Sequence, residues 1–192
     1  MRLSIKRIFL GGVLLALAAC SSPERFNGTD VSGVPWGGDF ELTAHTGKPF
    51  KSSDLRGKIT VLFFGYTHCP DICAPTLVKL AQAQRHLEAD ADRVQVLFVT
   101  VDPRHDTPSQ LAGFVPQFHP AFIGLTGSDA EIAAVAKAHN IPFERDSSKP
   151  NQIDHSGVIL VKDTQGRMRL VLKSEAGVDD IVHDLRLLLR RT

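Results

Sequence analysis

The sequence has almost no net charge and no long run of charges of one sign. Its 22 lysines and arginines nearly balance its 21 aspartates and glutamates, which leaves a formal net charge of +1. Binding to nucleic acid depends on a surplus of basic groups that neutralise phosphates, so this balance gives no electrostatic case for nucleic acid. The chain of 192 residues is 43% hydrophobic, which suffices for one packed domain and gives no sign of disorder.

The sequence also lacks an apolar run of the ~20 residues that a bilayer-spanning helix needs. A shorter apolar stretch, 8–19, follows a basic start made by Arg2, Lys6 and Arg7, and it ends in small residues. A positive flank, a short apolar core and small residues at the end are typical of an export signal, which we predict over residues 1–19. A membrane-spanning helix is the alternative.

Cysteine is scarce: the sequence has three cysteines, with Cys20 near the start and Cys69 and Cys73 close together. The sequence Leu17–Cys20 resembles a bacterial lipobox, and this resemblance implies cleavage before Cys20 and acylation of its thiol. Three cysteines in an exported protein leave one unpaired. Lipidation of Cys20 accounts for the odd one and leaves Cys69 and Cys73 as a pair. We therefore expect a lipoprotein of the cell envelope that is anchored to the membrane and faces the periplasm.

Two regions follow the predicted signal. Residues 20–38 are rich in Ser, Pro and Gly and show no periodicity, which is typical of a flexible tether. From there to residue 192 the pattern alternates between apolar runs and amphipathic stretches, which indicates one domain over 39–192. We predict strands over 40–44 (an edge strand), 58–66, 94–101, 122–125, 158–162 and 168–172, and helices over 76–87, 108–115, 128–139 and 178–190. This order predicts an α/β fold with a central mixed β-sheet flanked by helices. The closing hairpin and helix fit the thioredoxin-like plan.

The segment Tyr66–Thr76 carries the most chemical information, because it lies where a buried strand turns into a helix. Cysteines at the start of a helix have a lowered pKa and are readily thiolates. Three residues separate Cys69 from Cys73, where redox thioredoxins have two. A four-residue offset within a helical turn places both side chains on one face. Such a pair either closes a disulfide or binds a soft metal ion such as Cu(I) or Zn.

Two thiolates rarely suffice for a metal, and His155 is the candidate for a third ligand. It shortly precedes the strand 158–162, and in a thioredoxin fold the loop before that strand faces the cysteine turn. Two sulfurs and one imidazole suit Cu(I), and also Cu(II) if a weak fourth ligand is added. We expect Asp154 or a backbone carbonyl to orient the ring. Asp71 is expected either to be a solvated turn residue or to tune the thiolate charge and the docking of a partner.

Taken together, these segments resemble the Sco/SenC family of copper proteins. The resemblance covers about residues 35–190. Its motifs are Tyr66–Cys73, Thr100–Pro103 with Asp106–Pro108, and Asp154–Ser156. It implies a thioredoxin-like fold and a role in assembling the binuclear copper centre of cytochrome c oxidase.

The resemblance also implies copper as the bound metal, held by Cys69, Cys73 and His155. In one departure from the family, His105 stands directly before the Asp-Thr-Pro element, where an Arg is often found. His68 adjoins Cys69, and we expect its ring to point away from that neighbour's side chain.

Three readings of the cysteine pair remain open at this point. The first is a copper-binding metallochaperone, a transfer protein and not a catalyst, whose partner is the copper-accepting subunit of cytochrome c oxidase or another periplasmic cuproprotein. The second is a periplasmic thiol–disulfide oxidoreductase that acts on cysteines of the copper-accepting protein. The third is a structural disulfide, although closing so short a loop constrains little of the unfolded chain.

Overall fold

The computed structural model describes residues 24–145 and 152–192. The predicted export signal and Cys20 lie outside these residues. Within them, no helix is both long enough and apolar enough to cross a bilayer. The α-helices are α1 (Cys73–His86), α2 (Pro108–Phe114), α3 (Asp129–Ala138) and α4 (Val178–Arg190). The strands are β1 (Thr29–Asp30), β2 (Glu41–Ala44), β3 (Pro49–Lys51), β4 (Ile59–Gly65), β5 (Val94–Thr100), β6 (Ile123–Thr126), β7 (Phe143–Arg145), β8 (Ile153–His155), β9 (Val158–Lys162) and β10 (Met168–Lys173).

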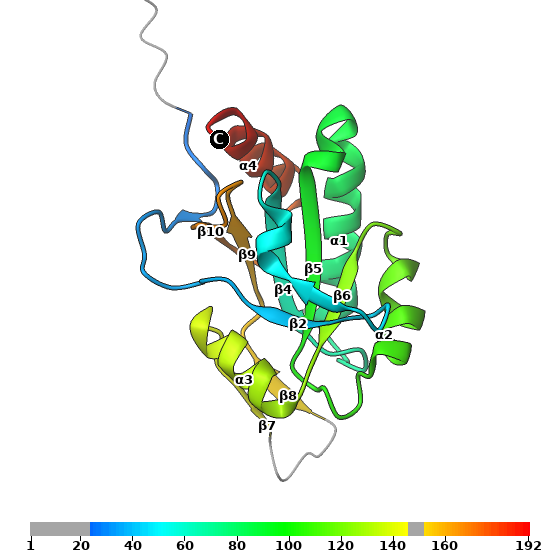
Figure 1. Ribbon diagram of the computed structural model, residues 1–192. Helices are drawn as coiled ribbons and strands as arrows, with labels where there is room; N and C mark the ends of the chain where they lie inside the picture. The colour runs from blue at the N-terminus through cyan, green and yellow to red at the C-terminus, as the bar shows by residue number, and fades with distance from the viewer. Residues whose placement is uncertain (1–23, 146–151) are drawn as a thin grey trace, which may run out of the picture.

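Eight of these strands form one mixed sheet in the order β1-β10-β9-β4-β5-β6-β2-β3 (Figure 1). Strands β4, β5 and β6 are parallel, whereas β9 runs antiparallel to β4 and β10 runs antiparallel to β9. The predicted α/β class with a central mixed sheet is therefore confirmed. The prediction that residues 40–44 form an edge strand is wrong, because β2 pairs with both β3 and β6.

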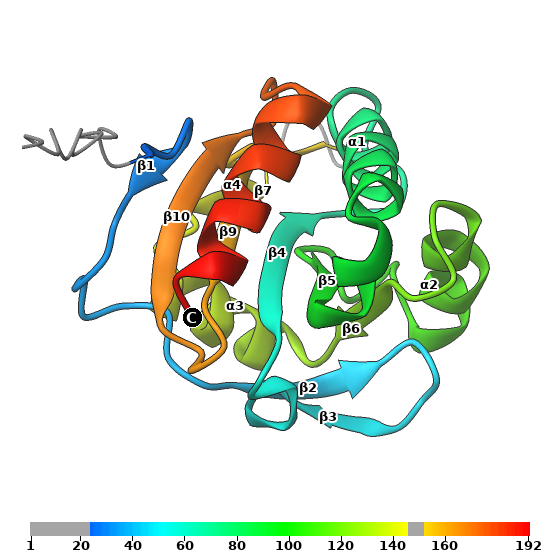
Figure 2. The same cartoon turned by 90° about the horizontal axis from the view of Figure 1, so that it is seen from above.

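Helices cover both faces of the sheet. Helices α1 and α4 lie side by side on one face (Figure 2), and α3 packs on the other. Strand β4 is buried along its whole length, as its unbroken apolar sequence indicates. Its side chains alternate between the two cores, with Phe63 on the α1 side and Phe64 on the α3 side. The carboxyl end of β4 thus emerges from the middle of the molecule directly before the cysteine loop.

The described part of the predicted tether, residues 24–38, is attached to the domain, which corrects the expectation of a flexible segment there. Strand β1 pairs with β10. The backbone N–H groups of Asn27 and Gly28 each donate to the carboxylate of Asp184 at 2.8 Å. Asp184 is fully buried in α4, and a buried carboxylate needs such donors. The backbone ahead of β2 is therefore held by a charge-assisted contact that local composition does not reveal.

Candidate metal centre

A buried carboxylate holds the loop between β4 and α1. The backbone N–H and the hydroxyl of Thr67 donate to Asp106 at 2.9 and 2.6 Å, and the hydroxyl of Thr100 donates to it at 2.7 Å. Asp106 has no exposed surface. Since a buried carboxylate is stable only when its lone pairs are occupied, these contacts fix the loop to the end of β5. The cysteine loop therefore starts from a rigid point.

The two cysteines have different places in the local structure. Cys73 is the first residue of α1, and its side chain is buried. Cys69 lies four residues ahead of it in the loop, is partly exposed, and like Cys73 is a free thiol. Beneath them, a Cβ at Gly65 would stand 2.7 Å from the Cys73 sulfur, closer than atoms approach. Glycine at the end of β4 thus makes room for the buried thiol.

The imidazole of His155 approaches the sulfurs from a separate two-stranded sheet, formed by β7 and β8. Its Nε2 lies 3.6 Å from the Cys73 sulfur, and one donor atom from each of Cys69, Cys73 and His155 lies within 4.8 Å of the other two. The Nδ1 atom lies 3.3 Å from the Ser156 carbonyl. Nε2 is therefore the ring nitrogen that faces the sulfurs, and Nδ1 faces the backbone carbonyl.

The two thiols share one proton unequally. The pKa of Cys69 is lowered, chiefly because the Cys73 S–H donates a hydrogen bond to its sulfur. A hydrogen bond from the His155 side chain and the backbone N–H groups of Asp71 and Cys73 add to this, against the effect of burial. The same hydrogen bond, together with burial, raises the pKa of Cys73. At neutral pH the site therefore presents one thiolate at Cys69 and one thiol at Cys73. A bound metal ion takes the place of the thiol proton.

Two aspartates, Asp71 and Asp154, are the residues expected to act beside the metal ligands. The side chain of Asp71 is exposed, and its contribution to Cys69 is made by its backbone N–H. The carboxylate of Asp154 accepts from the Gln152 side chain at 3.2 Å. The group that contacts the His155 ring at Nδ1 is thus a backbone carbonyl, the second of the two expectations.

Comparison with known proteins now identifies the family. Residues 30–190 match the family model described as SCO1/SenC. The chain belongs to the SCO1/SenC family. The SCO2 homolog of mouse mitochondria is 36% identical over 154 residues, which cover 78% of this chain and 60% of the mouse protein. The SCO2-like protein of Rickettsia felis is 35% identical over 164 residues, which cover 81% of this chain and 80% of that protein.

A solved structure agrees with this assignment. The crystal structure of Arabidopsis thaliana ScoI with copper bound superposes with a TM-score of 0.76 at 34% identity, over 81% of this chain and 99% of that one. This likeness confirms the predicted thioredoxin-like fold. The chain spans less than two thirds of the mouse SCO2 homolog's own length.

Sequence reasoning missed a second group of side chains beside the cysteine loop. The rings of His68 and His105 lie 4.3 Å apart between centroids, and His105 also contacts Asp106. These residues lie 37 positions apart along the chain, as the numbering shows, and no helical or strand spacing relates them. The one available signal was His105 itself, which stands where Arg is often found in the SCO1/SenC pattern.

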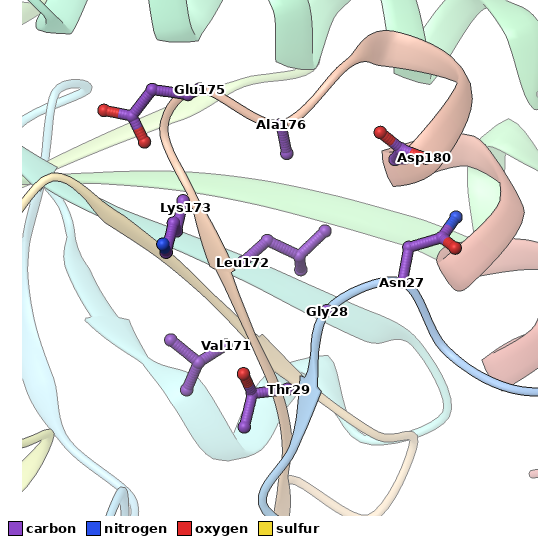
Figure 3. A pocket seen from close by; sticks show the side chains of 9 residues that line it. All are labelled: Asn27, Gly28, Thr29, Val171, Leu172, Lys173, Glu175, Ala176 and Asp180. Carbon is purple, nitrogen blue, oxygen red and sulfur yellow. The ribbon is translucent and has the colours of Figure 1, made fainter.

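Two hollows on the surface differ in their chemistry. A small one of about 190 Å³ includes Cys69 and His155 among its lining residues. A larger one of about 500 Å³ lies between β1, β10 and the start of α4 (Figure 3). Its charged side chains are Lys173, Glu175 and Asp180, and it is lined by no cysteine or histidine. Only the smaller of these two hollows therefore offers donors for a soft metal.

Proposed function

We propose that this chain is a metallochaperone that binds copper on Cys69, Cys73 and His155 and delivers it to the binuclear copper centre of cytochrome c oxidase. The convergence of two sulfurs and one imidazole nitrogen supports the proposal most directly, because soft thiolates select Cu(I) and imidazole also suits copper. The copper in the Arabidopsis relative supports the same metal. The acceptor follows from the role implied by the family, and another periplasmic cuproprotein is an alternative acceptor.

The burial of the three ligands sets an order for transfer. His155 and Cys69 are partly exposed, while Cys73 is 1% exposed. Thiolates of the acceptor therefore replace the two accessible ligands first and Cys73 last. Once the metal leaves, the Cys73 sulfur regains a proton and its hydrogen bond to Cys69, which favours release. The fixed loop and helix start retain their geometry throughout the exchange.

Replacement of His155 tests the copper site. We expect His155→Ala to weaken Cu(I) binding by at least ~10-fold under anaerobic conditions, since a metal ligand matters no less than the groups that orient it. The matched control is His86→Ala, which removes an exposed histidine of α1. An unchanged Cu(I) affinity in the His155→Ala variant would refute the assignment.

A thiol–disulfide oxidoreductase that acts on cysteines of the acceptor is the second candidate. The observation that favours it is the unequal pair, with a thiolate at Cys69 beside a thiol at Cys73, because such a pair carries out disulfide exchange. The same His155→Ala variant separates the two functions. An oxidoreductase keeps most of its exchange rate with a disulfide substrate after this change, whereas a copper carrier loses its cargo.

We also propose that the chain is a lipoprotein held at the membrane through Cys20 and exposed to the periplasm. The proposal is supported by the basic start, the short apolar stretch and the lipobox-like sequence Leu17–Cys20. We expect the wild-type chain to fractionate with membranes and to carry acyl groups on Cys20 by mass spectrometry. An unmodified Cys20 in membrane-associated protein would contradict the anchor.

A further inference from the structure

A second set of metal-ligand side chains lies beside the cysteine loop and takes no part in the site described above. One nitrogen of His68, one nitrogen of His105 and one oxygen of Asp106 lie within 4.8 Å of one another. Neither histidine belongs to the group formed by the two cysteines and His155. Donors around a tetrahedral ion with bonds of about 2.1 Å are separated by about 3.4 Å. Modest side-chain rotation therefore brings this set to coordinating distance.

His105 is oriented in the way that metal-binding histidines are. Its Nδ1 lies 2.9 Å from the Asp106 carboxylate, which accepts, so the proton resides on Nδ1 and the Nε2 lone pair is free. A carboxylate behind a ligating imidazole fixes the ring and increases its basicity. Asp106 is itself fully buried and held by Thr67 and Thr100. The ring is therefore positioned by a rigid part of the fold.

His68 has an unused ring nitrogen. Its Nε2 lies 3.6 Å from the Asp102 carboxylate, whereas its Nδ1 is buried and has no hydrogen-bond partner within the residues that the structure describes. A buried polar atom without a partner is unfavourable, and either a water molecule or a metal ion would satisfy it. The unpartnered nitrogen stands in a ring 4.3 Å from the His105 ring, centroid to centroid. The two histidines thus offer one free nitrogen each.

The surrounding charges favour a cation, and the site is accessible. The carboxylates of Asp102 and Asp106 contact the two rings. Arg145 forms an ion pair with Asp102, and that ion pair leaves the negative charge of Asp106 uncompensated. The side chain of His68 is 30% exposed and that of His105 is 48% exposed. A metal ion is able to reach the His105 ring from solvent, and rotation of the partly exposed His68 ring brings its buried Nδ1 to the ion.

We propose that His68 and His105 form a second metal site, which takes a divalent ion of intermediate softness such as Cu(II) or Zn(II), with Asp106 positioning His105. Imidazole suits these ions, while a site without thiolates has no special preference for Cu(I). The site is separate from the proposed copper site in its ligands.

The test uses a parent variant of the full-length chain, kept in detergent, in which all three cysteines are replaced so that no thiol can bind the metal. The substitutions are Cys20→Ala, Cys69→Ala and Cys73→Ala. We expect it to bind Zn(II) in calorimetry, and to bind Cu(II) with electron paramagnetic resonance couplings from two imidazole nitrogens. Adding His105→Arg, which introduces the residue often found at this position in the family, should weaken both ions at least tenfold and remove one nitrogen coupling.

The matched control adds His86→Arg to the same parent, because His86 is an exposed histidine that belongs to neither group. This control should bind as the parent does, and circular dichroism should show that all three proteins are folded. Absence of binding by the parent overturns the proposal. Equal binding by the parent and the His105→Arg variant also overturns it, and would assign the metal to His155 or to scattered histidines. Because no variant in this experiment has the cysteine pair, its outcome is independent of the proposed carrier function.

Discussion

The unequal protonation of the two cysteines predicts how copper affinity changes with pH. In the free protein Cys69 is a thiolate because its pKa is lowered, and Cys73 is a thiol because its pKa is raised. Binding of Cu(I) by both sulfurs therefore releases one proton, from Cys73. The association constant should rise about tenfold for each pH unit. Between about pH 7 and about pH 8.5 the loss of this one proton increases the association constant about 30-fold.

Alternative protonation states give different slopes in the same measurement. Two ordinary thiols, with pKa values of about 8.5, are both largely protonated at about pH 7 and give an increase of about 270-fold over this range, and two preformed thiolates give none. The affinity is measured anaerobically by competition with a chromophoric Cu(I) chelator, whose own protonation is corrected for. Calorimetry in two buffers of different ionisation enthalpy counts the protons directly. A count near zero or near two would refute the hydrogen-bonded thiolate–thiol pair.

Three further predictions concern the cysteines and the carboxylate that holds their loop. At about pH 6, iodoacetamide should alkylate Cys69 and spare Cys73, because only the thiolate reacts; peptide mass spectrometry that finds equal modification would contradict this. The reduced protein should bind copper and the Cys69–Cys73 disulfide form should not, since a disulfide sulfur is a poor ligand; titrations that give equal binding would disprove it. Asp106→Ala should lower the free energy of unfolding by about 2–4 kcal/mol in urea, because it leaves several buried donors without an acceptor, whereas the exposed control Asp92→Ala should change it by less than ~0.5 kcal/mol.

Elements whose cause is local could be predicted from the sequence. The capping box of Ser128 and Glu131 is present at the start of α3, and the Thr107 hydroxyl accepts from the Gln110 N–H at the start of α2. The closing helix, expected over 178–190, is α4 with the same bounds. In each case a few neighbouring residues satisfy the free backbone groups of a helix end or define one apolar face. These signals do not depend on the rest of the fold.

Short strands could not be predicted, because their pairing partners define them. Strands β1, β7 and β8 have two or three residues each, too few to show a period of two. Each exists because a distant segment supplies its backbone partners, and strand preference follows such context. This matters for the metal centre, since β8 carries His155. The expected convergence of His155 with the cysteines came from the thioredoxin-like plan, and no local pattern required it.

The reason given for the cysteines' proximity was wrong in one respect. Helix α1 begins at Cys73, three residues before the predicted start, because Pro75 is tolerated in a first turn, whose N–H groups have no helical partners. Cys69 is therefore outside the helix, and a helical offset does not align the two side chains. The loop is held instead by Asp106, through its contacts with Thr67. The sequence shows this carboxylate only as part of the Asp106–Pro108 motif, without its contact to Thr67.

The separation of tasks between these elements is what the proposed function requires of a site that both holds and releases a metal. Cys73 is built into the core, where Gly65 leaves space for its sulfur. Cys69 lies on a loop fixed at one end, and His155 lies on a two-stranded sheet outside the main one. In the proposed copper site, a soft ion would thus be attached to one buried ligand and two accessible ones. Exchange at the accessible ligands would need no unfolding of the core, so the domain would remain intact during the proposed transfer to an acceptor.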